Sequence, residues 1–300
     1  MNHNTNKAHV DIPIADVLCN TFSIVACDRT TGALGVAVAS KAFSVGSLVP
    51  WVKPEVGAIA TQALTSTEYG WQGLNLLSQG LPPREALAHL LQHDQLSSKR
   101  QIGMVDGAGR TAVHTGNQCL PHAVHKQGLG VTCQGNLLDS PEVVEAMMDA
   151  FLRCTRKFEH CLLAALRAGQ DRGGDRRGKQ SAALLVHVPD SNRAHRGMID
   201  LRVDDHHSPI AELQRLLDLY DLYYSPPEEQ DWLPVDGEVT ERIKNILNNM
   251  QDYDASAHDR LTQEDLEAFE QLLWKENLSE HLTKYSVDRR AIEYLERRLD

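Results

Sequence analysis

The sequence predicts an α+β protein in which antiparallel sheets carry their helices on the outside, followed by a small acidic helical domain. Strand-like segments follow one another in twos and threes and helix-like segments in pairs, unlike the regular alternation of a parallel sheet. Acidic residues are also concentrated at one end, because positions 225–300 hold 19 Asp and Glu against 9 Lys and Arg. We therefore expect either one sheet covered by helices or two stacked sheets between helix layers.

The first strands are expected at 21–27 and 33–40, where β-branched and small apolar residues flank a turn-forming segment. This pattern predicts a β-hairpin. Residues 57–63 repeat it, and their small side chains indicate a strand that is packed on both faces. Apolar residues then recur every three or four positions around 71–77 and 87–91, which predicts two consecutive helices.

The rest of the first module continues in the same grouped order. Glycines between short apolar runs predict a second hairpin, and Ser–Pro pairs predict two helix starts. The expected elements are strands at 101–106, 110–114 and 130–134, helices at 140–153 and 159–169, strands at 180–188 and 198–203, and a helix at 208–223. In the acidic quarter, apolar spacing predicts three short helices near 239–247, 266–273 and 292–299.

Composition excludes several functional classes. No run approaches the roughly 18 apolar residues of a membrane span, so no membrane partner is expected. The net charge of −11 argues against nucleic-acid binding, which needs clustered Lys and Arg. The first twenty residues lack the pattern of a secretory signal, and the six scattered cysteines include no C-x-x-C pair. We therefore expect reduced cysteines and a cytoplasmic location, although an even cysteine count would also suit an oxidising compartment.

Thr21 opens the first predicted strand. In most proteins such a threonine is simply a β-branched strand residue. If the chain were cut before it, however, its α-amino group would have a pKa near 8 and would act as general base for its own hydroxyl. The same residue is thus either structural or an N-terminal nucleophile.

Several ordered motifs resemble a bacterial family known as domain of unknown function 1028, which is grouped with the N-terminal-nucleophile (Ntn) hydrolases. The resemblance covers about residues 20–224. The motifs are TFSIVACD at 21–28, GVAVASK at 35–41, GAIATQ at 57–62, QGN at 134–136 and GDRRGKQS at 174–181. This resemblance implies a four-layer αββα sandwich in which Thr21 is the catalytic nucleophile. It also implies an enzyme that needs no cofactor.

The resemblance also implies roles for residues near the strand ends. Ser40 and Lys41 match the end of the second strand, where a hydroxyl and a charge often assist the nucleophile; otherwise Lys41 is a solvated strand end. A nearby ammonium would lower the pKa of the threonine amine and help offset the negative charge of its alkoxide. Gln134, Gly135 and Asn136 are either donors to an oxyanion or a polar turn before the next helix.

Further residues are candidates for binding the substrate. Asp175, Arg177, Gln180 and Ser181 lie where a loop enters a strand, so Arg177 either grips a substrate carboxylate or pairs with Asp175. Gln62, on an apolar run, either contacts a substrate amide or is a hydrogen-bonded core residue. No metal is expected, because the histidines and the acidic run near 252–259 lack the spacing of a zinc or calcium site.

These observations lead to two hypotheses. The first is an Ntn-type amidohydrolase that cleaves a small-molecule amide or N-acyl substrate through Thr21 after a leader, residues 1–20, is removed from the Ntn-like domain at 21–224. The second is a non-catalytic ligand-binding or scaffold protein in which the leader blocks Thr21. The domain at 225–300 resembles the peptidoglycan-binding-like module attached to many family members, and its acidic surface equally suits contacts in a homo-oligomer.

Overall fold

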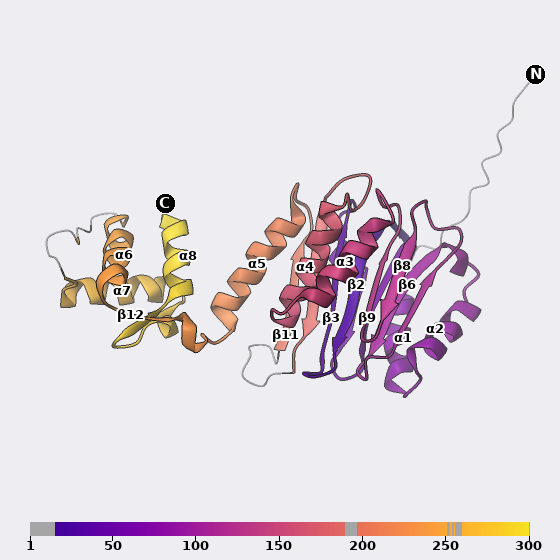
Figure 1. Cartoon of the computed structure of the whole chain (residues 1–300), viewed down its shortest axis with the longest axis horizontal. Helices are drawn as coiled ribbons and strands as arrows, with labels where there is room; N and C mark the ends of the chain where they lie inside the picture. The colour runs from indigo at the N-terminus through magenta and orange to yellow at the C-terminus, as the bar shows by residue number, and fades with distance from the viewer. Residues whose placement is uncertain (1–15, 190–196, 251–252, 254, 256–259, 300) are drawn as a thin grey trace, which may run out of the picture. The chain divides into compact units, whose positions relative to one another are not determined.

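The computed structural model describes residues 16–189, 197–250, 253, 255 and 260–299 (Figure 1). The chain forms two compact units, which divide between Leu216 and Leu217 inside helix α5 (Pro209–Tyr224). The boundary proposed from charge, after residue 224, falls at the end of this same helix.

Unit 1 contains two antiparallel sheets. Sheet A has the order β1–β5–β6–β7, with β4 also paired to β5, and sheet B has the order β11–β10–β3–β2–β9–β8. The strands of sheet A are β1 (Asp16–Cys19), β4 (Pro50–Lys53), β5 (Gly57–Ser66), β6 (Arg100–Asp106) and β7 (Thr111–Thr115). Those of sheet B are β2 (Thr21–Asp28), β3 (Ala33–Ser40), β8 (Val124–Gly128), β9 (Val131–Gly135), β10 (Ser181–His187) and β11 (Met198–Val203).

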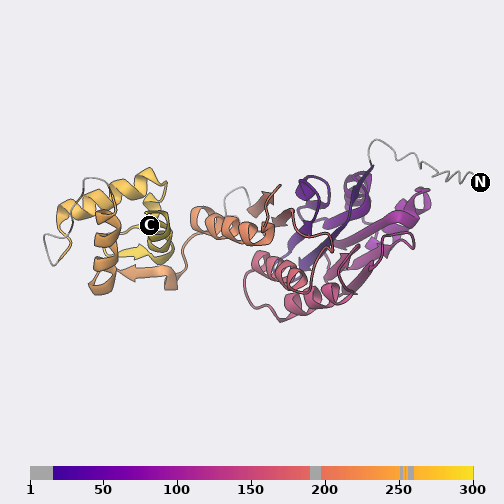
Figure 2. The ribbon, with the colours of Figure 1, turned by 90° about the horizontal axis from the view of Figure 1, so that it is seen from above.

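The two sheets of unit 1 face each other and carry helices on their outer faces (Figures 1 and 2). α1 (Glu68–Ser78) packs on β4 and β5, and α2 (Pro83–Gln92) on β6 and β7. On the other side, α3 (Glu142–Arg153) packs on β8 and β9, and α4 (Phe158–Asp171) on β2, β3 and β10. The prediction of antiparallel sheets with outer helices is therefore confirmed, and two sheets are present rather than one.

Apolar burial explains how the sheets are held. Between the sheets lies a cluster of small and β-branched side chains that includes Val25, Val36, Ala58 and Val105, all of them fully buried. Such side chains allow close approach of two strand layers. Gly103 on β6 shows how close this approach is, because a Cβ at that position would collide with the side chains of β9. A second cluster, centred on Ile59, fills the space between sheet A and its helices.

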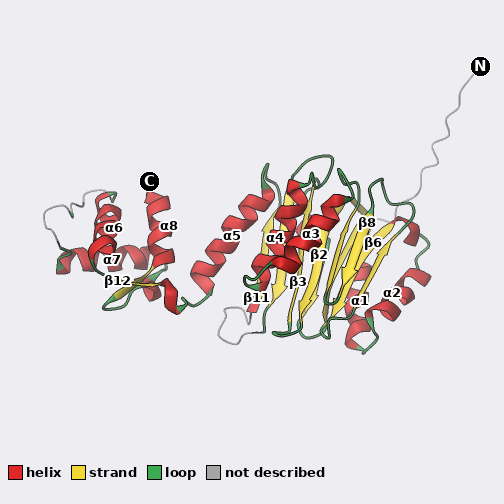
Figure 3. Cartoon of the chain, in the orientation of Figure 1, coloured by secondary structure: helices red, strands yellow, loops and turns green. Residues whose placement is uncertain are grey.

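Unit 2 is a small helical domain with a two-stranded sheet (Figure 3). Its elements are β12 (Trp232–Pro234), α6 (Gly237–Asn248), α7 (Gln263–Lys275), β13 (Ser286–Asp288) and α8 (Arg289–Leu299). A core that includes Ile243, Phe269 and Leu295 joins the three helices, as the apolar spacing predicted. The acidic run considered for calcium lies largely outside the described residues, apart from Tyr253 and Ala255.

Two differences from the sequence-based expectations concern cysteines and short strands. Cys154, which follows α3 directly, forms a disulfide with Cys161 in α4, so the expectation of six reduced cysteines was wrong for this pair. The helical hairpin brings together two thiols that are seven residues apart in sequence.

Five short strands were not predicted, because they are short or polar and acquire their structure from a neighbouring strand. They are β1, β4, β8, β12 and β13. None of the described helices is long and apolar enough to cross a membrane.

Candidate functional site

The candidate site surrounds the peptide bond between Asn20 and Thr21, where the chain passes from sheet A to sheet B. β1 ends at Cys19 and β2 begins at Thr21, so Asn20 is the single residue between the sheets. Both Asn20 and Thr21 are buried, with 2% and 0% exposure. The β2–β3 hairpin places Ser40 directly opposite Thr21 in the register.

The carbonyl oxygen of Asn20 accepts two hydrogen bonds from side chains. Ser40 Oγ donates to it at 2.6 Å and Arg177 Nη2 at 3.0 Å. Arg177 is held in place by Asp175, whose buried carboxylate accepts from Nε at 3.0 Å and from Nη2 at 2.7 Å. A hydroxyl and a guanidinium on one carbonyl oxygen stabilise negative charge there, because the guanidinium hydrogen bond is charge-assisted.

The hydroxyl of Thr21 points back toward the preceding strand. Thr21 Oγ1 donates to the backbone oxygen of Cys19 at 2.9 Å and lies 3.6 Å from Cys19 Sγ. Burial raises the pKa of the Cys19 thiol, so the thiol is protonated at neutral pH. In the intact chain the hydroxyl is therefore enclosed by residues that precede it.

The backbone oxygen of Thr21 belongs to a buried polar network between the sheets. It accepts from the backbone N–H of Asn136 at 3.0 Å and from Gln62 Nε2 at 3.2 Å. Gln62 Nε2 also donates to Gln101 Oε1 at 2.8 Å, and Gln62 Oε1 accepts from Ser23 Oγ at 2.6 Å. Gln62 thus ties β2 of one sheet to β5 and β6 of the other.

The QGN segment at 134–136 completes this network. Gln134 Nε2 donates to Ser23 Oγ at 2.7 Å, and Asn136 Nδ2 donates to Gln101 Oε1 at 2.9 Å. The backbone oxygen of Gly135 accepts from Gln101 Nε2 at 2.9 Å. The side-chain amides proposed as oxyanion donors are therefore engaged within the core. Their oxygens, Gln134 Oε1 and Asn136 Oδ1, are buried and accept no hydrogen bond from the described part of the chain.

The remaining predicted residues hold the loop that follows β3. Lys41 is exposed, its Nζ donates to the backbone oxygen of Lys179 at 3.3 Å, and its backbone N–H donates to Asp175 at 3.0 Å. Ser181 Oγ donates to the backbone oxygen of Ala42 at 2.6 Å, while Gln180 Nε2 donates to Asp205 at 3.0 Å. The structure thus places Ser40 and Arg177 on the carbonyl oxygen that precedes Thr21, and Gln62 and Asn136 on the carbonyl oxygen of Thr21 itself. Contacts within nearby loops hold Lys41, Gln180 and Ser181.

Sequence reasoning did not single out three residues of this site. Asn20 was treated only as the residue before Thr21, yet its carbonyl oxygen is the atom on which Ser40 and Arg177 converge. Cys19 was counted among the buried cysteines. Gln101 lies opposite Gln62 in the β5–β6 register, so two glutamines at the ends of predicted apolar strands were the available signal.

The fold and the site define a two-unit α+β protein with a buried threonine at the start of a central strand. A family model described as "Family of unknown function (DUF1028)" matches residues 21–213, and the chain belongs to this family. The crystal structure of protein SPO2555 from Silicibacter pomeroyi, of the same family, is 33% identical and has a TM-score of 0.62. The match covers 67% of this chain and 89% of that one. No curated protein matches the chain.

Proposed function

We propose that this protein is a self-processing Ntn-type amidohydrolase, in which Thr21 is the nucleophile once residues 1–20 have been released. One observation carries the proposal. The carbonyl oxygen of Asn20, next to Thr21, is held by Ser40 Oγ and by the guanidinium of Arg177. The two donors satisfy a buried carbonyl oxygen in the intact chain, and donors of this kind also stabilise an oxyanion during acyl transfer.

The proposed release of the leader proceeds in two steps. Thr21 Oγ attacks the carbonyl carbon of Asn20, and the hydroxyl proton passes to the departing nitrogen of Thr21. The C–N bond breaks, leaving Asn20 esterified to Thr21 Oγ. Water then hydrolyses the ester, which yields a carboxylate at Asn20, a free hydroxyl and a free α-amino group at Thr21. Ser40 and Arg177 stabilise the tetrahedral oxyanion in both steps.

The same groups then serve an amide or N-acyl substrate. The new α-amino group of Thr21 acts as general base for its hydroxyl, because its pKa lies near 8 when unperturbed. Asn136 and Gln62 hold the backbone oxygen of Thr21 and so fix the position of the nucleophile. The two facing sheets with outer helices are the arrangement expected for an Ntn-type αββα sandwich. No metal or cofactor takes part in this scheme.

A second candidate function is a non-catalytic ligand-binding protein, and one observation favours it. Thr21 Oγ1 is buried and donates to Cys19, and β1 is paired into sheet A, so the leader blocks the threonine in the intact chain. For unit 2, the peptidoglycan-binding-like and oligomer-contact roles both remain proposals. The cytoplasmic location is also a proposal, and the Cys154–Cys161 disulfide argues against it because disulfides are typical of an oxidising compartment.

The two functions are separated by the mass of the purified full-length chain. The hydrolase proposal expects a product whose N-terminal sequence begins at Thr21, and expects Thr21→Ala to keep the leader attached while Thr21→Ser still releases it. Replacing Arg177 by Met should slow release about 100-fold, because an oxyanion donor is lost. The exposed neighbour variant Arg176→Met is the matched control. A wild-type chain that retains residues 1–20 would contradict the hydrolase proposal and leave the second function as the candidate.

A further inference from the structure

We infer that β1 occupies the place of the substrate, and that the substrate is an extended peptide with an acidic residue at the position of Asp16. The inference rests on the proposed function and specifies its N-acyl substrate as a peptide. β1 adds a strand to β5 by pairing Asp16–Cys19 with Ala63–Ser66. The family match begins at Thr21, so β5 belongs to the family domain and β1 does not. Without β1, the domain has an open sheet edge beside Thr21.

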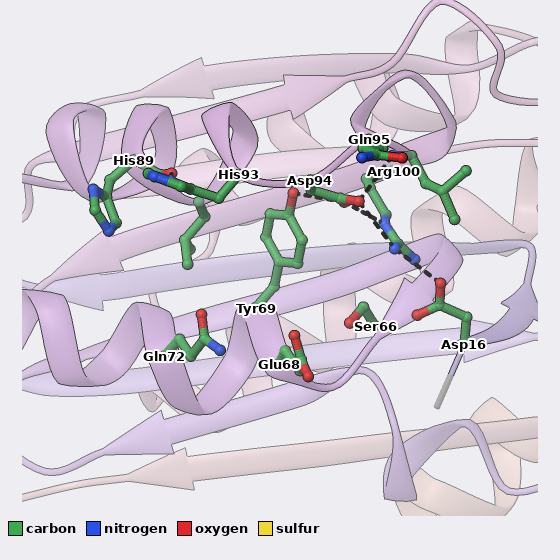
Figure 4. A pocket seen from close by; sticks show the side chains of 12 residues that line it. Asp16, Ser66, Glu68, Tyr69, Gln72, His89, His93, Asp94, Gln95 and Arg100 are labelled. Carbon is green, nitrogen blue, oxygen red and sulfur yellow. Dashed lines mark hydrogen bonds and ion pairs between the residues drawn. The ribbon is translucent and has the colours of Figure 1, made fainter. Parts of the chain in front are cut away.

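A buried cation marks the far end of this edge (Figure 4). Arg100 is 4% exposed, and its Nη2 donates to the carboxylate of Asp16 at 2.9 Å. Within the family domain, Nε donates to Asp94 at 2.7 Å, Nη1 donates to the backbone oxygen of Leu64 at 2.6 Å, and Nη2 also donates to Asp94 at 3.4 Å. The Asp16 side chain is only 3% exposed, so its carboxylate fills a defined position beside Arg100. A charge-assisted hydrogen bond in such a buried setting selects a carboxylate.

The pattern of burial along the leader indicates which substrate positions are recognised. Asp16, Cys19 and Asn20 have buried side chains, whereas Val17 and Leu18 are 43% and 55% exposed. Backbone pairing to β5 places Asp16–Cys19, and the burial of the Asp16 and Cys19 side chains sets which positions the domain encloses. The expected substrate therefore has an acidic residue four positions before the residue whose carbonyl is attacked, and tolerates changes at the positions of Val17 and Leu18.

Space at the start of β1 is consistent with a longer peptide. A cavity of about 560 Å³ adjoins Asp16 and Arg100 and extends between the start of α1 and the end of α2. Its wall includes Tyr69, which donates to Asp94 at 2.9 Å, and the side chains of His89 and His93 (Figure 4). Release of the leader thus clears both the strand position and the path to Thr21 Oγ1.

The test uses the processed full-length protein and synthetic peptides, so no protein variant has to fold. The probe is the N-acetylated peptide of residues 16–22, DVLCNTF, and its cleavage between Asn and Thr is followed by mass spectrometry. A peptide carrying Asp16→Asn should lose about tenfold or more in kcat/KM, mainly through KM, because it lacks the charge for Arg100. A peptide carrying Val17→Asn, changed at an exposed position, should stay within about twofold of the parent.

Three outcomes would overturn the inference. If the processed chain does not cleave the parent peptide, the substrate is not a peptide of this kind, whatever the chain does to small amides. If it cleaves the Asp16→Asn peptide as fast as the parent, Arg100 does not select a carboxylate. If the leader stays attached to the wild-type chain, the proposed function fails as well, and the mass of the chain shows this before any peptide is added.

Discussion

Both units bury polar side chains, but these side chains have different partners. In unit 2 several lie at helix starts: Asp288 accepts from the backbone N–H of Arg290 in α8, and Asp265 forms a reciprocal cap with Thr262 at α7. In unit 1 several of them, including Gln62 and Ser40, hydrogen-bond the backbone around Thr21. A cap satisfies backbone groups that any helix leaves unpaired. In unit 1 the unpaired group lies at a strand junction, where the carbonyl oxygen of Asn20, between β1 and β2, accepts from Ser40 and Arg177.

The largest expected effect would test whether the two units are independent. Phe269 is fully buried in the core of unit 2, and Phe269→Ala should lower the free energy of unfolding of that unit by about 4 kcal/mol, through lost burial and a cavity. Hydrogen exchange resolved by segment should accelerate in α6–α8 and stay unchanged in β2 and β9. Trp274→Ala, at a 72% exposed position, is the control. Equal acceleration in β2 would show that the units unfold together.

A somewhat smaller effect is expected from the network between the sheets. Gln62→Leu removes hydrogen bonds to Ser23, Gln101 and Thr21, and leaves those buried groups short of partners. It should lower the free energy of unfolding of unit 1 by about 2 to 3 kcal/mol, measured by urea denaturation. Gln127→Leu, at an exposed position on β8, is the matched control. A loss no larger than that of the control would mean that the network contributes little stability.

The hydrogen bonds of Asp288 at the start of α8 predict that the stability of unit 2 depends on pH. Burial by itself would raise the pKa of Asp288, but hydrogen bonds from His281 and Arg290 outweigh it and lower the pKa to about 2. Since the unfolded value is about 3.9, Asp288 stabilises unit 2 above about pH 4, and this contribution is lost as the pH falls toward 2.

Asp288→Asn should therefore cost unit 2 about 2 kcal/mol at pH 7 and flatten the stability profile between pH 4 and 2. Hydrogen exchange in α8 across that range is the measurement. Asp236→Asn is the control, because the Asp236 side chain makes no capping hydrogen bond at the start of α6. An unchanged slope in the Asp288 variant would contradict the assignment.

The smallest effect concerns an ion pair at the surface of unit 2. Arg242 and Glu296 form a two-point pair at 2.7 Å, with side chains 24% and 35% exposed. Solvent screens such pairs, so a double-mutant cycle with Arg242→Gln and Glu296→Gln should give a coupling below about 1 kcal/mol that shrinks in salt. A coupling of several kcal/mol would mean that surface charges stabilise unit 2 more than its helix caps do.

Much of the fold followed from local pattern. The sequence predicted strands β2, β3 and β5 and the helix pairs α1–α2 and α3–α4. In each of these elements, the spacing or run of apolar residues within the segment indicates its secondary structure. β1 could not be predicted in the same way, since DVLC has two exposed apolar residues and a buried charge. Its strand conformation depends on pairing with β5, which lies more than forty residues away in sequence.

The site was predictable only in part. The family resemblance implied that Ser40 faces Thr21, and the β2–β3 register puts the two residues opposite each other. The approach of Arg177 to the Asn20 carbonyl could not be read from the chain, because 157 residues separate them. Lys41 follows Ser40 in sequence but contacts Lys179 rather than the threonine, since the chain leaves the strand at that point.

The sequence by itself determined the class of fold, the division into a nearly neutral module and an acidic one, and the threonine at the head of a strand. These properties depend on composition and on how apolar residues repeat within a segment, every second residue in a strand and every three or four in a helix. Both are local features of the sequence. Only the tertiary structure decided that Ser40 and Arg177 hold one carbonyl, that Gln62 joins the two sheets, and that Asp16 pairs with Arg100. Such contacts join distant segments, and their geometry is set by how the sheets stack.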